Sequence, residues 1–184
     1  MSATQPQKPG PRTNNIGEML RVDHAGEYGA VAIYRGQRAV FDKLPHKARL
    51  AALLKDMEEG EIHHLETFDQ LLAARKIRPT LLAPFWNVAG FGLGAATALM
   101  GEKAAMACTA AVEDVIEKHY DQQAEILDAN EPELAATIRQ FREDELEHKH
   151  TAQAEGAEDA LGSRALSAVI RLGCRAAIRI AEKI

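Results

Sequence analysis

Two Glu-x-x-His steps stand out as residues whose types and spacing could do chemistry. They are Glu61-x-x-His64 and Glu145-x-x-His148. Side chains three positions apart lie on the same face of an α-helix, so each step would present one carboxylate and one imidazole together. Iron and manganese both accept this combination of ligands in proteins. The two steps therefore predict a transition-metal site, provided that the fold brings them together.

A lone glutamate precedes each step at nearly the same distance. Glu27 lies 34 residues before the first step, and Glu113 lies 32 residues before the second. Turns near Leu44–Pro45 and at Asn130 would place each lone glutamate level with its step, because a helix rises about 1.5 Å per residue. The pattern predicts an all-α four-helix bundle built from two duplicated helical hairpins.

The predicted helices carry these charged residues on their apolar faces. The stripe that contains the first step consists of Leu50, Leu53, Leu54, Met57, Leu65, Phe68 and Leu72. Buried carboxylates are costly unless they take up a proton or a cation. A dinuclear centre would satisfy all the charges at once, and the spacing does not distinguish iron from manganese. The predicted metal ligands are Glu27, Glu61, His64, Glu113, Glu145 and His148.

A solvated helix face is the alternative interpretation of one Glu-x-x-His step, because 27% of the residues are charged. Two matched steps in register favour the metal site instead. Charges off the stripe, such as Glu58, are predicted to be solvated. Asp144 directly precedes a predicted ligand, and it could orient a histidine on a facing helix.

Several segments resemble the demethoxyubiquinone hydroxylases, the di-iron monooxygenases of ubiquinone biosynthesis. These segments are Leu20–Ala30, Arg78–Thr80, Pro84–Val88, Ala105–Thr109, Ala111–Glu113 and Phe141–His148. The likeness runs from about Ile16 to the C-terminus. It implies a ferritin-like bundle, two iron ions on the same six ligands, and O2 as the oxidant. It also implies a hydrophobic isoprenoid quinone as substrate and NADH as the two-electron donor.

Length and composition fit one helical domain. The chain has 184 residues, 46% of them hydrophobic and only 5% aromatic. We predict a domain over residues 16–184 and a disordered arm over residues 1–15, which lack the features of a signal or transit peptide. A net charge of −5 argues against nucleic-acid binding, and two cysteines are too few for a disulfide framework. We expect a peripheral protein on the cytoplasmic face of a bacterial inner membrane.

The segment Thr80–Gly101 contains no charged residue. Its glycines and Pro84 argue against a transmembrane span, although its length would suffice. Two interpretations remain, a buried connecting helix between the hairpins or a helix at a membrane interface, and we favour the interface. The residues predicted to contact the membrane or to line a substrate entrance are Phe85, Trp86, Phe91 and Leu93.

A basic amphipathic helix is predicted over residues 165–184, where Arg171, Arg175 and Arg179 recur every four residues. It would suit a membrane surface, or equally a bundle helix with one solvated face. His119 and Tyr120 follow Glu113 by about two turns and are candidates for a reductant or quinone pocket. An ordinary surface pair is the alternative.

Three other functions fit parts of the pattern. A ferritin-like protein that stores iron or removes peroxide could use the same ligands, but it would not need the apolar segment. A di-iron hydroxylase of another substrate would share the bundle. A non-catalytic lipid-binding protein would need no metal. The sequence leaves open whether the chain forms a homo-oligomer or needs a lipid-presenting partner protein.

Overall fold

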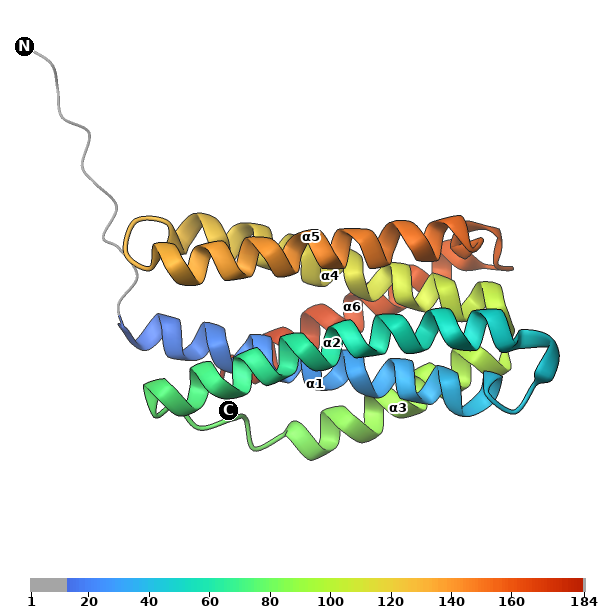
Figure 1. The fold of residues 1–184 in the computed structure, drawn as a ribbon, viewed down its shortest axis with the longest axis horizontal. Coiled ribbons are helices and arrows are strands. Elements are labelled where there is room, and N and C mark those ends of the chain that lie inside the picture. The colour runs from blue at the N-terminus through green and yellow to red at the C-terminus, as the bar shows by residue number, and fades with distance from the viewer. Residues whose placement is uncertain (1–12, 184) are drawn as a thin grey trace, which may run out of the picture.

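The computed structural model describes residues 13–183, and these form an all-α bundle with no strand (Figure 1). The all-α, ferritin-like bundle predicted from the sequence is therefore confirmed. The helices in chain order are α1 (Thr13–Phe41), α2 (Ala48–Arg75), α3 (Ala83–Leu99), α4 (Glu102–Leu127), α5 (Pro132–Ala154) and α6 (Ser163–Ala181). Two short 3-10 helices, η1 (Pro45–Lys47) and η2 (Ala157–Asp159), precede α2 and α6.

Two helical pairs run along the long axis of the molecule. Helix α1 packs against α2, and α4 packs against α5, while α2 and α5 touch only sparingly. The first pair turns within residues 42–47 and the second within residues 128–131, where the turns were predicted. Descent of the two pairs from a duplicated hairpin stays a prediction.

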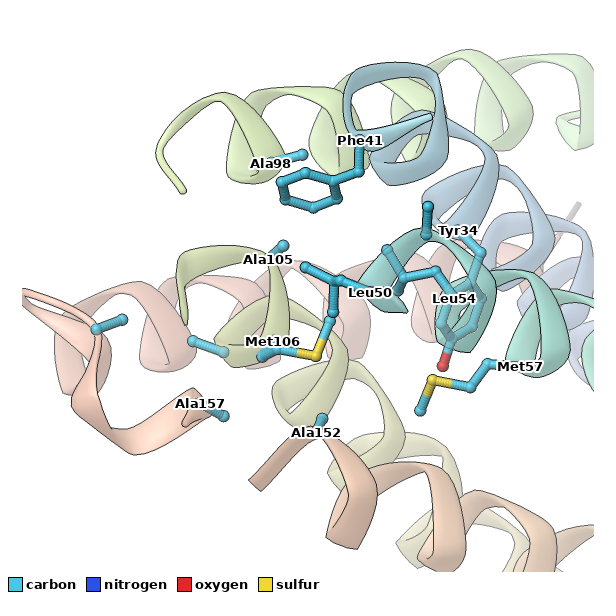
Figure 2. Close-up of a cluster of buried hydrophobic side chains, with 13 residues drawn as sticks. Tyr34, Phe41, Leu50, Leu54, Met57, Ala98, Ala105, Met106, Ala152 and Ala157 are labelled. Carbon is cyan, nitrogen blue, oxygen red and sulfur yellow. The ribbon is translucent and has the colours of Figure 1, made fainter. Parts of the chain in front are cut away.

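Two apolar clusters hold the bundle at successive heights. The first cluster gathers side chains from five of the helices and from the residues around η2, including Tyr34, Leu54 and Met106 (Figure 2). The second lies nearer the opposite end of the bundle and includes Phe68 and Ile138. Every helix of the two pairs contributes to both clusters, and each carries its predicted metal ligands between them. The charged side chains are thus enclosed by apolar packing on both sides.

Helix α3 lies against the outer side of α1, and backbone packs directly on backbone there (Figure 1). A Cβ at Gly90 would lie 2.7 Å from the carbonyl oxygen of Gly29, and one at Gly94 would lie 2.0 Å from that of Ile33. Only glycine allows so close an approach. Phe85, Val88 and Leu99 of α3 are exposed on its other side, so the interpretation of α3 as a buried connector is wrong. None of the described helices combines the length and the apolarity needed to cross a bilayer.

Two details differ from the sequence-based expectations. Helix α1 begins at Thr13, three residues before the predicted domain boundary, while residues 1–12 of the predicted arm lie outside the described residues. Glu58 is buried rather than solvated, because it accepts hydrogen bonds from Arg35 at 3.0 Å and from Arg38 at 2.7 Å. These two guanidinium groups come from the facing helix, which the local pattern around Glu58 could not indicate.

Candidate metal centre

The bundle brings all six predicted ligands together. They form two groups, and in each group one donor atom per residue lies within 4.8 Å of all the others. One group is Glu27, Glu61, His64 and Glu145, and the other is Glu61, Glu113, Glu145 and His148. Glu61 and Glu145 belong to both groups, so their carboxylates could serve both if each group held an ion. The four glutamates are at most 1% exposed.

Several donor atoms of the cluster are buried without a hydrogen-bond partner among residues 13–183. They are Oε2 of Glu27, Glu61 and Glu113, both carboxylate oxygens of Glu145, and Nδ1 of His64. Native proteins satisfy nearly all buried polar atoms, and an unpaired buried carboxylate oxygen is especially costly. Unsatisfied oxygen and nitrogen atoms that face one another in this way match the donor set of a divalent transition metal.

Burial and mutual repulsion raise the pKa values of three of the carboxyl groups. Burial and, to a smaller extent, the negative charge of Glu61 raise the pKa of Glu27 to about 8, although His64 acts to lower it. The same two causes raise the pKa of Glu113 to about 7. The pKa of Glu145 is raised well above its ordinary value for the same two reasons. Burial also acts on Glu61, but the hydrogen bond from His148 and the charges of both cluster histidines outweigh it and lower its pKa. Without metal, the cluster therefore holds protons that a cation must displace.

The side chains of His64 and His148 contact these carboxylates directly. Nδ1 of His64 lies 3.2 Å from Oε1 of Glu145, and Nδ1 of His148 lies 2.9 Å from Oε1 of Glu61. Burial alone would lower the pKa of His64, but the neighbouring carboxylates outweigh it and raise that pKa. The same competition raises the pKa of His148. The raised pKa values favour the protonated form of both imidazoles, whose charge would offset part of the negative charge in the metal-free cluster.

Two tyrosines bind carboxylates of the cluster in a reciprocal pattern. The hydroxyl of Tyr34 on α1 donates to Oε1 of Glu113 on α4 at 2.7 Å. The hydroxyl of Tyr120 on α4 donates to Oε1 of Glu27 on α1. Each tyrosine follows the lone glutamate of its own helix by seven residues, which places both on the same face. That spacing could have indicated Tyr34, which was not among the predicted site residues.

Residues beyond the six ligands fix the orientation of the histidines. Nε2 of His64 lies 3.2 Å from Oδ2 of Asp144, the contact that the sequence suggested, and Gln140 donates to the same carboxylate. Nε2 of His119 lies 3.1 Å from Oδ1 of buried Asp23, whose other oxygen accepts from Gln123 at 2.7 Å. His119 therefore contacts the carboxylate of Asp23 on α1 and is not part of the metal cluster.

A mainly apolar groove of about 350 Å³ runs beside the cluster between α1, α3, α4 and α6. Ala30 and Ile116 on its wall lie one helical turn beyond Glu27 and Glu113, respectively. The groove therefore approaches the cluster from the side of the two lone glutamates.

The sequence matches the family described as "Ubiquinone biosynthesis protein COQ7" over residues 14–181. The chain belongs to this family. It is 50% identical to the 3-demethoxyubiquinol 3-hydroxylase of Rhodospirillum rubrum over 92% of this chain and 78% of that protein. It is 45% identical to the mouse protein named NADPH-dependent 3-demethoxyubiquinone 3-hydroxylase, mitochondrial, over 91% of this chain and 77% of the mouse protein. A yeast relative, 5-demethoxyubiquinone hydroxylase, mitochondrial, is 40% identical over 100% of this chain and 88% of its own length.

Membership of the COQ7 family confirms the resemblance seen in the sequence and supports a hydroxylase, an oxidoreductase of ubiquinone biosynthesis. The names of its relatives place them in bacteria or in mitochondria. The mouse relative is named for NADPH, whereas the resemblance found in the sequence implied NADH as the electron donor.

The residues predicted at a membrane or substrate entrance in this COQ7-family chain divide into two kinds. Trp86 and Leu93 line the groove. Phe85 and Phe91 are exposed on the outer side of α3. Tyr120 is buried against Glu27, so the surface-pair interpretation is wrong for this residue, and His119 is only partly exposed.

Proposed function

We propose that this protein is a di-iron monooxygenase that uses O2 to hydroxylate the ring of a demethoxyubiquinone or demethoxyubiquinol at a membrane surface. The observation that carries the proposal is the buried cluster of four glutamates and two histidines, whose unpartnered oxygens face one another. Family membership supports the hydroxylase part of the proposal. The cluster supports the metal part.

Each ion would have its own terminal ligands and share two bridges. Glu27 and His64 would hold one ion, and Glu113 and His148 the other. When bound, the iron pair supplies the redox chemistry that carboxylate and imidazole side chains lack. Tyr34 and Tyr120 would each keep one carboxylate oxygen occupied, so that the second oxygen of that carboxylate is left for metal.

The protein keeps the cluster dry and holds its histidines in place. Apolar clusters lie on both sides of it along the bundle. Asp144 would accept the Nε2 proton of His64 and so leave Nδ1, which faces the carboxylates, as the ligand atom. Carboxylates that lack hydrogen bonds to water interact more strongly with a cation, because the local dielectric constant is low.

The groove gives the ring a route from the surface. Its apolar wall suits a quinone with an isoprenoid tail, and it approaches the cluster beside Glu27 and Glu113. Helices α3 and α6 flank it and expose large apolar side chains, namely Phe85, Val88, Phe91, Val169 and Leu172. Exposed apolar patches of this kind mark contact surfaces, and we assign this one to the membrane that carries the substrate.

We propose a reduced nicotinamide nucleotide as the electron donor. The name of the mouse relative gives NADPH, and the resemblance found in the sequence implies NADH. Both should therefore be supplied in the test.

The test is anaerobic reconstitution with ferrous iron, followed by ¹⁸O₂, a short-tailed demethoxyubiquinone and either nucleotide. Mass spectrometry should show one labelled oxygen atom in the product, and Glu61→Gln should abolish the gain. Metal analysis in the same samples should give two irons per chain. Full iron loading without a hydroxylated product would instead favour iron handling or another substrate. Hydroxylation without iron would refute the proposed metal centre.

A further inference from the structure

The arginines of this chain fall into two sets, those that pair with an acidic residue and those that do not. The paired set, in which each guanidinium forms an ion pair with a carboxylate, is Arg35, Arg38, Arg49, Arg75, Arg139, Arg142 and Arg171. The second set, for which residues 13–183 provide no ion pair, is Arg21, Arg78, Arg164, Arg175 and Arg179. We call the second set the unpaired arginines. Their charges remain available to an anion from outside the chain.

The unpaired arginines lie on or beside the helices that flank the groove. Three of them belong to α6, and Arg78 lies in the loop that leads into α3. Arg21 donates from Nε to the carbonyl oxygen of Arg78 at 3.3 Å. Its neighbour Val22 packs with Trp86 of α3 and Ala181 of α6. The start of α1, the start of α3 and the end of α6 therefore bring unpaired charges into one region.

No acidic residue occurs in the two segments that contain α3 and α6. Residues 70–101 include all of α3 and residues 160–181 include all of α6, yet the 27 acidic residues of the chain lie outside both. Asp114 of α4 approaches α6 but is engaged by Arg171 at 3.0 Å, and Glu182 directly follows the helix. The chain has a net charge of −5. The side formed by α3 and α6 is thus basic on a protein that is acidic as a whole.

On α6 the unpaired arginines form a row beside an apolar stripe. Arg164, Arg175 and Arg179 are exposed, and at about 100° per residue they lie within about 60° of one another around the helix axis. Val169 and Leu172 follow on one side of this row, and each is 69% exposed. Val169 also lines the groove, so the apolar stripe lies between the arginines and the groove. The helix presents charge and apolar surface side by side to the solvent.

We propose that the side formed by α3 and α6 binds a bilayer of anionic phospholipids, with the unpaired arginines on the lipid phosphates. This inference rests on the proposed function, which requires a membrane, and it adds the charge of the lipids. A guanidinium matches a phosphate group in charge and in donor geometry. Exposed side chains such as Phe85 and Val88 would stay in water against a nucleic acid, whereas a bilayer accepts both apolar and basic groups.

The same lipids would also orient the protein. Anionic headgroups attract the basic side and repel the acidic charges on the rest of the chain. The groove opens between α3 and α6, so this orientation turns its apolar wall toward the bilayer. Apolar contact alone would not distinguish one lipid headgroup from another, whereas the unpaired arginines do.

Vesicle flotation of the full-length protein tests the charge of the lipid directly. Vesicles of phosphatidylcholine alone are compared with vesicles of phosphatidylcholine and phosphatidylglycerol, at low and at high salt. The partition coefficient at low salt should be about tenfold or more higher on the anionic vesicles, because several arginines near an anionic surface act together. High salt should remove most of this difference, since it screens exposed charges.

Paired substitutions locate the effect on α6. Arg175→Gln combined with Arg179→Gln should lower the partition coefficient on anionic vesicles about tenfold and leave that on phosphatidylcholine unchanged. The matched control is Arg49→Gln combined with Arg139→Gln, which removes the same net charge from exposed positions on α2 and α5. It should bind anionic vesicles within about twofold of the unaltered protein. Arg175→Lys combined with Arg179→Lys should keep most of the binding, because the charge is retained.

Each outcome separates this inference from the proposed function. Equal binding of the unaltered protein to both kinds of vesicle, or equal losses in the two glutamine variants, overturns the role of the unpaired arginines while the hydroxylase proposal stands. Binding to neither kind of vesicle overturns this inference together with the membrane part of that proposal. Should the variants fail to fold, the lipid and salt dependence of the unaltered protein still decides the question.

Discussion

Glu27 on α1 accepts a hydrogen bond from Tyr120 on α4, and Glu113 on α4 accepts one from Tyr34 on α1. These two hydrogen bonds connect α1 to α4 at the level of the cluster. The two hydroxyls donate to one oxygen of each carboxylate and leave Oε2 without a partner. In this arrangement the protein has positioned the carboxylates before any cation arrives. Pre-positioned ligands reduce the ordering cost of binding.

Replacing the bridge residue Glu145 by glutamine should affect both ions, since Glu145 belongs to both ligand groups. We expect Glu145→Gln to lose most of its bound iron and all hydroxylation. Its melting temperature without metal should stay the same or rise, because the amide cannot take on the charge that burial disfavours in Glu145. Glu147→Gln, two residues along and exposed, should behave as the unaltered protein in metal analysis and calorimetry. Normal iron content in Glu145→Gln would rule out its role as a bridge.

The raised carboxyl pKa values also predict how the metal-free protein responds to pH. Glu27 and Glu113 have pKa values of about 8 and about 7, above their ordinary value of 4.5. Between pH 4.5 and about 8 the folded chain therefore binds more protons than the unfolded chain, so the free energy of unfolding falls as pH rises. The melting temperature should decrease from about pH 5.5 to about pH 8, and Glu27→Gln should reduce the slope. A melting temperature that climbs across this window would contradict the assignment.

The predicted ligands were accessible to sequence reasoning because they recur at helical spacing in both halves. Asp144 was accessible because it adjoins a ligand. The burial of Glu58 was not, since the arginines that bind it come from another helix, and local spacing does not show which way a side chain turns in the fold. Trp86 was predicted at the membrane or at a substrate entrance, and it lies in the groove wall.

At the scale of elements, α3 is held to α1 by close backbone contact. Gly36 on α1 takes part as well, since a Cβ there would lie 2.2 Å from the carbonyl oxygen of Phe91. The apolar composition of Thr80–Gly101 indicated a helix with an unusual surface. It could not show which side faces the bundle, because small residues replace the usual apolar stripe on the packed side.

Two glycine-to-alanine substitutions on α3 should distinguish the effect of the backbone contact with α1 from the effect of helix propensity on the free energy of unfolding. Gly94→Ala would place a methyl group 2.0 Å from the Ile33 carbonyl oxygen, and we expect it to lower the free energy of unfolding by about 2 kcal/mol or more. Gly92→Ala meets no atom within 4 Å, and it should be neutral or stabilising by up to about 1 kcal/mol. Urea denaturation of the two variants provides the measurement. Equal stability of both would mean that α3 does not pack on α1 as described.

At the scale of the whole molecule, the apolar side chains flanking the groove give the protein one side suited to lipid. Val88, which is 72% exposed on α3, belongs to this side. Val88→Asp should weaken binding to liposomes severalfold in flotation assays without changing the iron content. Ile126→Asp is the control, because Ile126 is also exposed but lies near the C-terminal end of α4. Equal flotation of the two variants would argue against a membrane role for α3.

Neither helical pair contains a complete ligand group. The first group needs Glu145 from the second pair, and the second group needs Glu61 from the first. On the proposed assignment, a chain emerging from the ribosome cannot hold iron until Glu145 has been synthesised, so most of the protein must be made and kept soluble without metal. Iron would then act as a late check on synthesis, because only a chain that extends at least to His148, with both pairs correctly docked, offers both ligand groups.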